Sequence, residues 1–171
     1  MQRLVSVFID IAFHRQGPDA LPASHFLFGL VVSAYSLVGA LTLALDRPFA
    51  QVIAAIVFHV GLYLTFIALV LAHARRGARF LQTATAALGV ETILGCIALP
   101  LLLTGAAGST DGGISILSSV TLLLIVVWSI DIVGFILARA LDRAYVVGVM
   151  IMLGYVVISM TLGEYLFPSS V

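Results

Sequence analysis

The sequence predicts an all-α, polytopic membrane protein: a bundle of five transmembrane helices preceded by a short amphipathic helix. Of its 171 residues, 62% are hydrophobic and 9% are charged, and the mean hydropathy is +1.21. A soluble domain carries about 25% charged residues, so this chain has too few polar side chains to cover a globule. Its apolar runs are about twice the length of a barrel strand and do not alternate with polar residues, which favours helices.

Five apolar runs are long enough to cross a bilayer, which takes about 20 residues in a helix. The predicted spans cover about 25–45, 50–72, 80–104, 114–138 and 144–166. Pro48 ends the first span, since the residue before a proline disfavours helix. A glycine-rich loop, 105–113, separates the third span from the fourth. We expect one membrane domain over residues 1–171, because no linker or repeat divides it.

Residues 1–22 form an interfacial segment before the first span. Apolar side chains recur at i, i+3 and i+4 within residues 1–14, which predicts an amphipathic helix with one apolar face: Leu4, Val7, Phe8, Ile11 and Ala12. Such a helix either lies at the membrane surface or packs on the protein's own loops, and periodicity does not separate the two. The prolines and glycine of RQGPDALPAS predict a turn, after which Ser24 is placed to cap the first span.

The arginines are distributed unevenly between the two sides of the predicted membrane domain. Five spans put the N-terminus, the 73–79 loop and the 139–143 link on one side, with every arginine except Arg47. Because basic residues gather in cytoplasmic loops, we expect the N-terminus in the cytoplasm and the C-terminus outside.

Three ionisable residues lie inside predicted spans: Glu91, His59 and Asp131. An acid in the hydrocarbon costs roughly 2.5–3.5 kcal/mol on insertion scales, so it is usually paired, neutralised or facing a cavity. Glu91 lies about 11 residues from the cytoplasmic end of its span and His59 about 13, depths that allow a hydrogen bond between them. Asp131 is shallower, about 8 residues deep at the same rise per residue. This depth allows Asp131 to reach an arginine of the cytoplasmic rim: Arg75, Arg79 or Arg139.

These three residues permit two interpretations. One is a proton or ion path, because intramembrane ionisable residues commonly mark such routes. The other is a buried polar clamp that fixes helix packing. Small residues share the Glu91 face of the third span and let another helix approach closely: Thr83, Ala84, Ala87, Gly95 and Ala98. A relay needs polar groups leading to both surfaces, and the outer half has few, so the sequence favours the clamp.

Arg75, Arg76 and Arg79 make 73–79 the most basic segment of the chain. They predict either a positive-inside anchor, which the sequence favours, or a site for an anionic lipid head group. No larger basic surface exists, so we expect no nucleic acid partner. The motifs HExxH and GxSxG are absent, and the four histidines and single cysteine lack ligand spacing. We therefore expect no catalytic residue, no metal and no other cofactor.

Three short segments carry a family resemblance: GPDALPAS before the first span, ARFLQTATAALG at the start of the third, and LGY at 153–155. With the five spans, they resemble the Yip1-type integral membrane proteins, in particular small bacterial members of unknown function. The resemblance implies a five-span protein of a bacterial inner (plasma) membrane, with the N-terminus in the cytoplasm. It brings no catalytic residues.

The sequence thus predicts a non-enzymatic membrane protein that acts as a scaffold or accessory subunit. Its expected partners are the lipid bilayer and either a second copy of the chain or another membrane protein. The alternative is a small transporter or channel component that uses Glu91, His59 and Asp131 as a proton or ion path. A membrane enzyme acting on lipid is the third interpretation.

Overall fold

A computed structural model describes residues 2–45, 47–108 and 116–167, without the side chains of residues 2–4 and 104–108. The described residues are helical and contain no strand, which confirms the all-α prediction. The helices are α1 (Gln2–Ala12), α2 (His25–Leu43), α3 (Phe49–His73), α4 (Phe80–Gly108), α5 (Ile116–Leu141) and α6 (Tyr145–Leu166). Short 3-10 turns, η1 (Pro18–Ala20) and η2 (Gly77–Arg79), precede α2 and α4.

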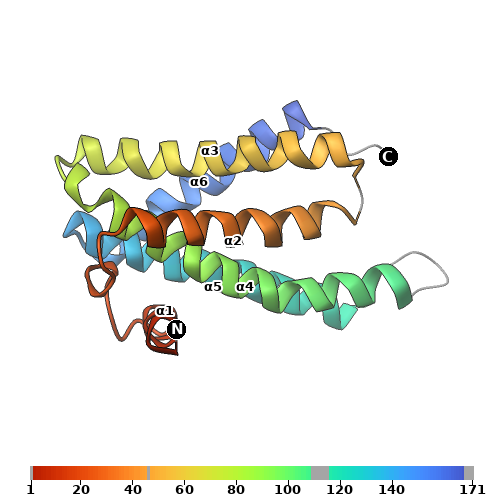
Figure 1. The fold of residues 1–171 in the computed structure, drawn as a ribbon, viewed down its shortest axis with the longest axis horizontal. Helices are drawn as coiled ribbons and strands as arrows, with labels where there is room; N and C mark the ends of the chain where they lie inside the picture. The colour runs from red at the N-terminus through yellow and green to blue at the C-terminus, as the bar shows by residue number, and fades with distance from the viewer. Residues whose placement is uncertain (1, 46, 109–115, 168–171) are drawn as a thin grey trace.

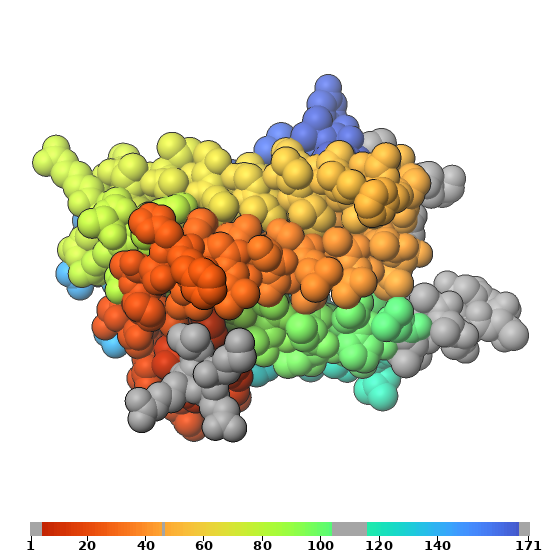
Figure 2. Space-filling view, in the orientation of Figure 1, coloured from red at the N-terminus to blue at the C-terminus, as the bar shows by residue number. Residues whose placement is uncertain are grey.

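Helices α2 to α6 are each long and apolar enough to cross a membrane. The chain is therefore a membrane protein with five spans, which run side by side along the long axis in Figure 1. Figure 2 shows α2 and α3 forming one continuous face of this bundle. We call the end with links 74–79 and 142–144 the arginine-rich end, and the opposite end, with link 44–48, the far end.

The observed spans begin close to their predicted starts, but α4 and α5 end later than predicted. Helix α4 continues through the alanines after Thr104 to Gly108, so the first part of the expected glycine-rich loop is helical. Residues 109–113 of that loop lie outside the described residues. The Ser24 cap is observed, since its Oγ accepts a hydrogen bond from the amide of Leu27 at 3.4 Å. The predicted turn before it contains the single helical turn η1.

Three helices end without a glycine. His14, Arg75 and Asp142, which follow α1, α3 and α5, have φ values of 58°, 58° and 57°. Each begins a closing turn in which the next amide bonds a carbonyl five residues back, as Arg143 does to Ala138 at 3.0 Å. The left-handed conformation costs a non-glycine residue roughly 1–2 kcal/mol, which these backbone hydrogen bonds offset. Helix ends of this kind leave no glycine signal in the sequence.

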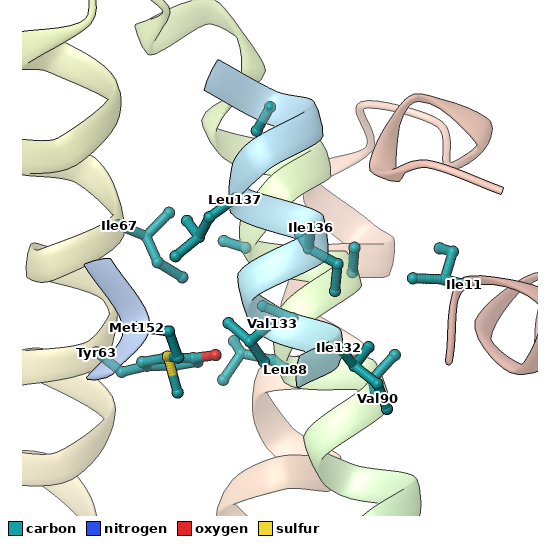
Figure 3. Packing of buried hydrophobic residues seen from close by; sticks show 14 of the residues in the cluster. Ile11, Tyr63, Ile67, Leu88, Val90, Ile132, Val133, Ile136, Leu137 and Met152 are labelled. Atoms are coloured by element: carbon teal, nitrogen blue, oxygen red, sulfur yellow. The ribbon is translucent and has the colours of Figure 1, made fainter. Parts of the chain in front are cut away.

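Packing is dense in the half of the bundle towards the arginine-rich end. There a group of apolar side chains fills the space between α3, α4, α5 and α6, and we call it the sealing layer: Ile67, Leu88, Val133, Leu137 and Met152. Figure 3 shows Ile67 and Leu137 facing each other, with Val133, Leu88 and Met152 beside them. No member is more than 4% exposed. In the far half, the described residues that are as deeply buried are few: Val52 and Ala55 of α3 and Leu94 of α4.

Helices α5 and α6 approach closely because two glycines face each other. A methyl group added at Gly148 would overlap the carbonyl oxygen of Gly134 and would lie 2.7 Å from the backbone nitrogen of Ala138. A methyl group at Gly134 would lie 2.7 Å from Cγ2 of Val149. Small residues at such a crossing let two backbones touch, which is how membrane helices gain packing energy.

Helix α1 is seen nearly end-on in Figure 1, so it lies across the axis of the bundle. It packs on α4 and α5. Phe8 and Ile11, from its predicted apolar face, are buried, and the Phe8 ring occupies the space that a side chain at residue 89 would need. The side chain of Leu4 lies outside the described residues. Val5 and Ile9, which flank this apolar face, are exposed.

Candidate functional site

The loosely packed far half of the bundle contains a central cavity of about 360 Å³. All five spans contribute to its wall, so it lies within the bundle and is not a groove between two neighbouring helices. Most of its lining is apolar. The polar side chains come from four helices: Tyr35 and Thr42 of α2, His59 of α3, Glu91 of α4 and Ser129 of α5.

Glu91 is partly buried near the middle of α4 and faces this cavity. The hydroxyl of Ser129 donates a hydrogen bond to Oε1 of Glu91 at 2.5 Å, which links α4 to α5. The hydroxyl of Thr92, the next residue, donates its hydrogen bond to the carbonyl oxygen of Leu88 in its own helix, at 2.7 Å, and not to Glu91. The carboxyl group therefore has one described side-chain donor and an open, mostly apolar space beside it.

Three tyrosines form an aromatic cluster next to this acid. The ring centroid of Tyr63 lies 6.4 Å from that of Tyr35 and 5.1 Å from that of Tyr155. All three rings are close enough to Glu91 to interact with it electrostatically. The hydroxyl of Tyr63 is buried and has no hydrogen-bond partner among the described residues. A buried hydroxyl without a partner costs free energy, which a water or a ligand in the cavity region would recover.

His59 lies on the boundary between two spaces. It lines the central cavity and also a second hollow, of about 250 Å³, at the far end between α3 and α6. That hollow is more polar and includes Arg47, Ser159 and Glu164. The hydrogen bond between Glu91 and His59 that their depths allow is not the one observed: the described partner of Glu91 is Ser129, and Glu91 and His59 both line the central cavity.

Asp131 does not join this site. Its carboxylate lies 3.2 Å from Nε2 of His14 and accepts a hydrogen bond from the hydroxyl of Tyr145. The imidazole of His14 also stacks on Phe135, with centroids 4.3 Å apart. The partners of Asp131 among the described residues are thus His14 and Tyr145, and not the arginines that its depth allowed. The reason is that α1 packs against α5 and places His14 beside the carboxylate of Asp131.

The arginines of the 73–79 segment contact the other link at the same end. Nη2 of Arg76 lies 3.1 Å from Oδ2 of Asp142. Nη1 of Arg79 donates to the carbonyl oxygens of Arg139 and Ala140 at 3.2 and 3.1 Å, where the negative end of the α5 dipole favours a cation. Arg75 is the residue in left-handed conformation after α3. Arg76 and Arg79 thus hold the two links together; the choice between anchor and head-group site stays a prediction.

Sequence reasoning missed the tyrosine cluster and Ser129. The available signal was the presence of hydroxyl groups inside otherwise apolar spans, where each hydroxyl needs a partner. Thr42 shows why this signal is weak, because its hydroxyl bonds the carbonyl of Val38 in its own helix at 3.0 Å. Ser129 differs from such residues because the rotation of α5 relative to α4 turns its hydroxyl towards Glu91.

No family model, curated protein or solved structure matches this chain. The resemblance to Yip1-type proteins therefore stays a prediction.

Proposed function

We propose that this protein is a small transporter or channel component that binds its solute in the central cavity, with Glu91 as the acidic binding group. The observation that carries this proposal is the place of Glu91 in a cavity walled by all five spans. A purely structural clamp would surround its acid with packed partners. Here Glu91 has one described side-chain donor, Ser129, and faces open space of about 360 Å³.

The sequence alone favoured a scaffold or accessory subunit because the outer half of the spans offered few polar groups. The polar side chains that line the two hollows weaken this argument for a scaffold. Tyr35, Thr42 and Ser129 line the central cavity, and His59 adjoins the second hollow that holds Ser159. These groups form a polar side of an otherwise apolar space, from the middle of the bundle to its far end. They support solute binding over a scaffold role.

We assign the arginine-rich end to the cytoplasm, since it gathers the basic residues. The cavity then faces the outer side of a plasma membrane, and the sealing layer closes the path towards the cytoplasm. The structure would correspond to a state open to the outside. Passage of a solute would require the helices around Ile67 and Leu137 to separate, as in alternating access. We assign no catalytic residue.

The test is proton movement into liposomes that contain the purified protein, under an imposed pH gradient with K⁺ and Na⁺ present. We expect movement above that of empty liposomes, and we expect Glu91→Gln to abolish it. Asp19→Asn is the matched control, because it makes the same carboxyl-to-amide change at an exposed position outside the cavity. Equal movement with wild type and Glu91→Gln, with both folded, would overturn the proposal.

A further inference from the structure

We infer that the solute held beside Glu91 is a lipophilic organic cation, such as a hydrophobic amine, quaternary ammonium or phosphonium ion. This inference rests on the proposed function and names its substrate class. It follows from three properties of the central cavity: its charge, its lining and its size.

The charge of the cavity favours a cation. Glu91 is the one acid among the residues that line it, and no lysine or arginine does. His59 is the other ionisable residue of the lining and lies where the cavity meets the second hollow. Asp131 is engaged with His14 and Tyr145 outside the cavity and does not contribute. An anion would therefore meet a carboxyl group without any fixed positive charge to offset it.

The lining excludes a bare metal ion as the preferred ligand. A hard cation such as Ca²⁺ takes about 6–8 oxygen ligands. Besides the two carboxyl oxygens of Glu91, the side-chain oxygens of the lining are the hydroxyls of Tyr35, Thr42 and Ser129, which together are fewer than such an ion takes. Across the described residues, no three His, Cys, Asp or Glu side chains come together in a group that could hold a metal. An organic cation needs one counter-charge and otherwise apolar contact.

The size and walls of the cavity fit such a molecule. Ligand pockets measure roughly 300–1,000 Å³ and are mostly apolar, with a few polar groups that set orientation. A volume of about 360 Å³ lies in this range, whereas one water occupies only about 30 Å³. Tyr35 adds an aromatic ring to the wall; Tyr63 stacks on Tyr35, and Tyr155 is tilted against Tyr63. Aromatic faces attract organic cations through their quadrupole.

The test is calorimetric titration of the full-length protein in mild detergent with tetraphenylphosphonium. Tetraphenylborate is the matched probe, since it has the same shape and the opposite charge. We expect saturable binding of the phosphonium ion by wild type, at least tenfold weaker binding by Glu91→Gln, and unchanged binding by Asp19→Asn. We expect no saturable binding of the borate.

Two further variants keep the inference testable if Glu91→Gln does not fold. Glu91→Asp retains the charge and is expected to retain binding. Ala98→Phe fills the cavity from α4 while leaving Glu91 in place, and is expected to weaken binding at least tenfold. Equal affinity for phosphonium and borate, or phosphonium binding unaffected by Glu91→Gln or by Ala98→Phe, would overturn the inference.

The two proposals fail in different ways. Absence of phosphonium binding, together with proton movement that depends on Glu91, would reject the organic cation and leave the transport proposal standing. Phosphonium binding that depends on Glu91, without proton movement, would reject the transport proposal and leave a binding site for organic cations. Absence of both would reject both.

Discussion

Ser129 of α5 donates a hydrogen bond to Glu91 of α4, and this bond forms part of the wall of the central cavity. Through this contact Glu91 has both roles open to an intramembrane acid, that of a structural clamp and that of a ligand-binding group. It helps fix how α4 lies against α5, and it leaves the rest of the carboxyl group facing open space. The consequence is that the structural and ligand-binding roles of Glu91 are separable by changing Ser129.

Ser129→Ala removes one hydrogen bond and leaves the carboxyl group in place. Side-chain hydrogen bonds between membrane helices are worth about 0.6 kcal/mol on average, with a maximum near 1.7. We therefore expect a loss of about 1 kcal/mol in the free energy of unfolding, measured by denaturant titration in detergent, with phosphonium binding retained. The double variant with Glu91→Gln closes a thermodynamic cycle. A coupling energy near zero would show that the bond does not hold α4 to α5.

The number of spans and their approximate starts followed from the sequence, because long apolar runs have few alternatives in a membrane protein. The end of α5 was harder to locate. Asp142 adopts a left-handed conformation that glycine usually occupies at helix ends, and the backbone hydrogen bond from Arg143 to Ala138 stabilises it.

The partners of the buried acids could not be read from the sequence, for two different reasons. Depth along a span is predictable from residue count, so Glu91 and His59 were expected at one level, and both line the same cavity. Rotation about a helix axis relative to its neighbours is not predictable in this way, and it decides that Ser129 reaches Glu91. The partner of Asp131 depended on the path of α1, which returns His14 to α5.

Thiol labelling tests both the cavity and the orientation of the chain. In a Cys96→Ser background, Thr42→Cys places a thiol in the cavity wall and Ile67→Cys places one in the sealing layer. With the far end outside, a membrane-impermeant maleimide added to intact cells is expected to label residue 42 and not residue 67, as mass spectrometry would record. Labelling of residue 42 only after the cells are opened would reverse the orientation. Equal labelling of both positions would contradict the sealing layer.

The close crossing of α5 and α6 predicts a strong effect of a single methyl group. Gly148→Ala would overlap the carbonyl oxygen of Gly134, so the two backbones must move apart. Overpacking of this kind costs about 1–3 kcal/mol, which we expect as a loss in the free energy of unfolding. Gly154→Ala is the control on the same helix, because nothing lies within 4 Å of its added methyl group. There we expect no loss, since alanine is the better helix former by roughly 1 kcal/mol. Equal effects at the two positions would contradict the observed crossing.

The attachment of α1 to the bundle can be followed through the single tryptophan of the chain. Trp128 of α5 lies 5.7 Å, between ring centroids, from Phe13, which follows α1. Phe8→Ala removes the ring that packs into the space at Gly89 and is expected to loosen α1, which shifts the emission of Trp128 and raises cleavage of residues 2–24 by protease. Val5→Ala shortens an exposed side chain of the same helix and is expected to change neither measurement.

If Phe8→Ala gave the same Trp128 emission and the same cleavage as Val5→Ala, α1 would be held by contacts other than the Phe8 ring. The Asp131–His14 pair would then be the contact to remove next, because it anchors the residue that closes the α1 turn to α5.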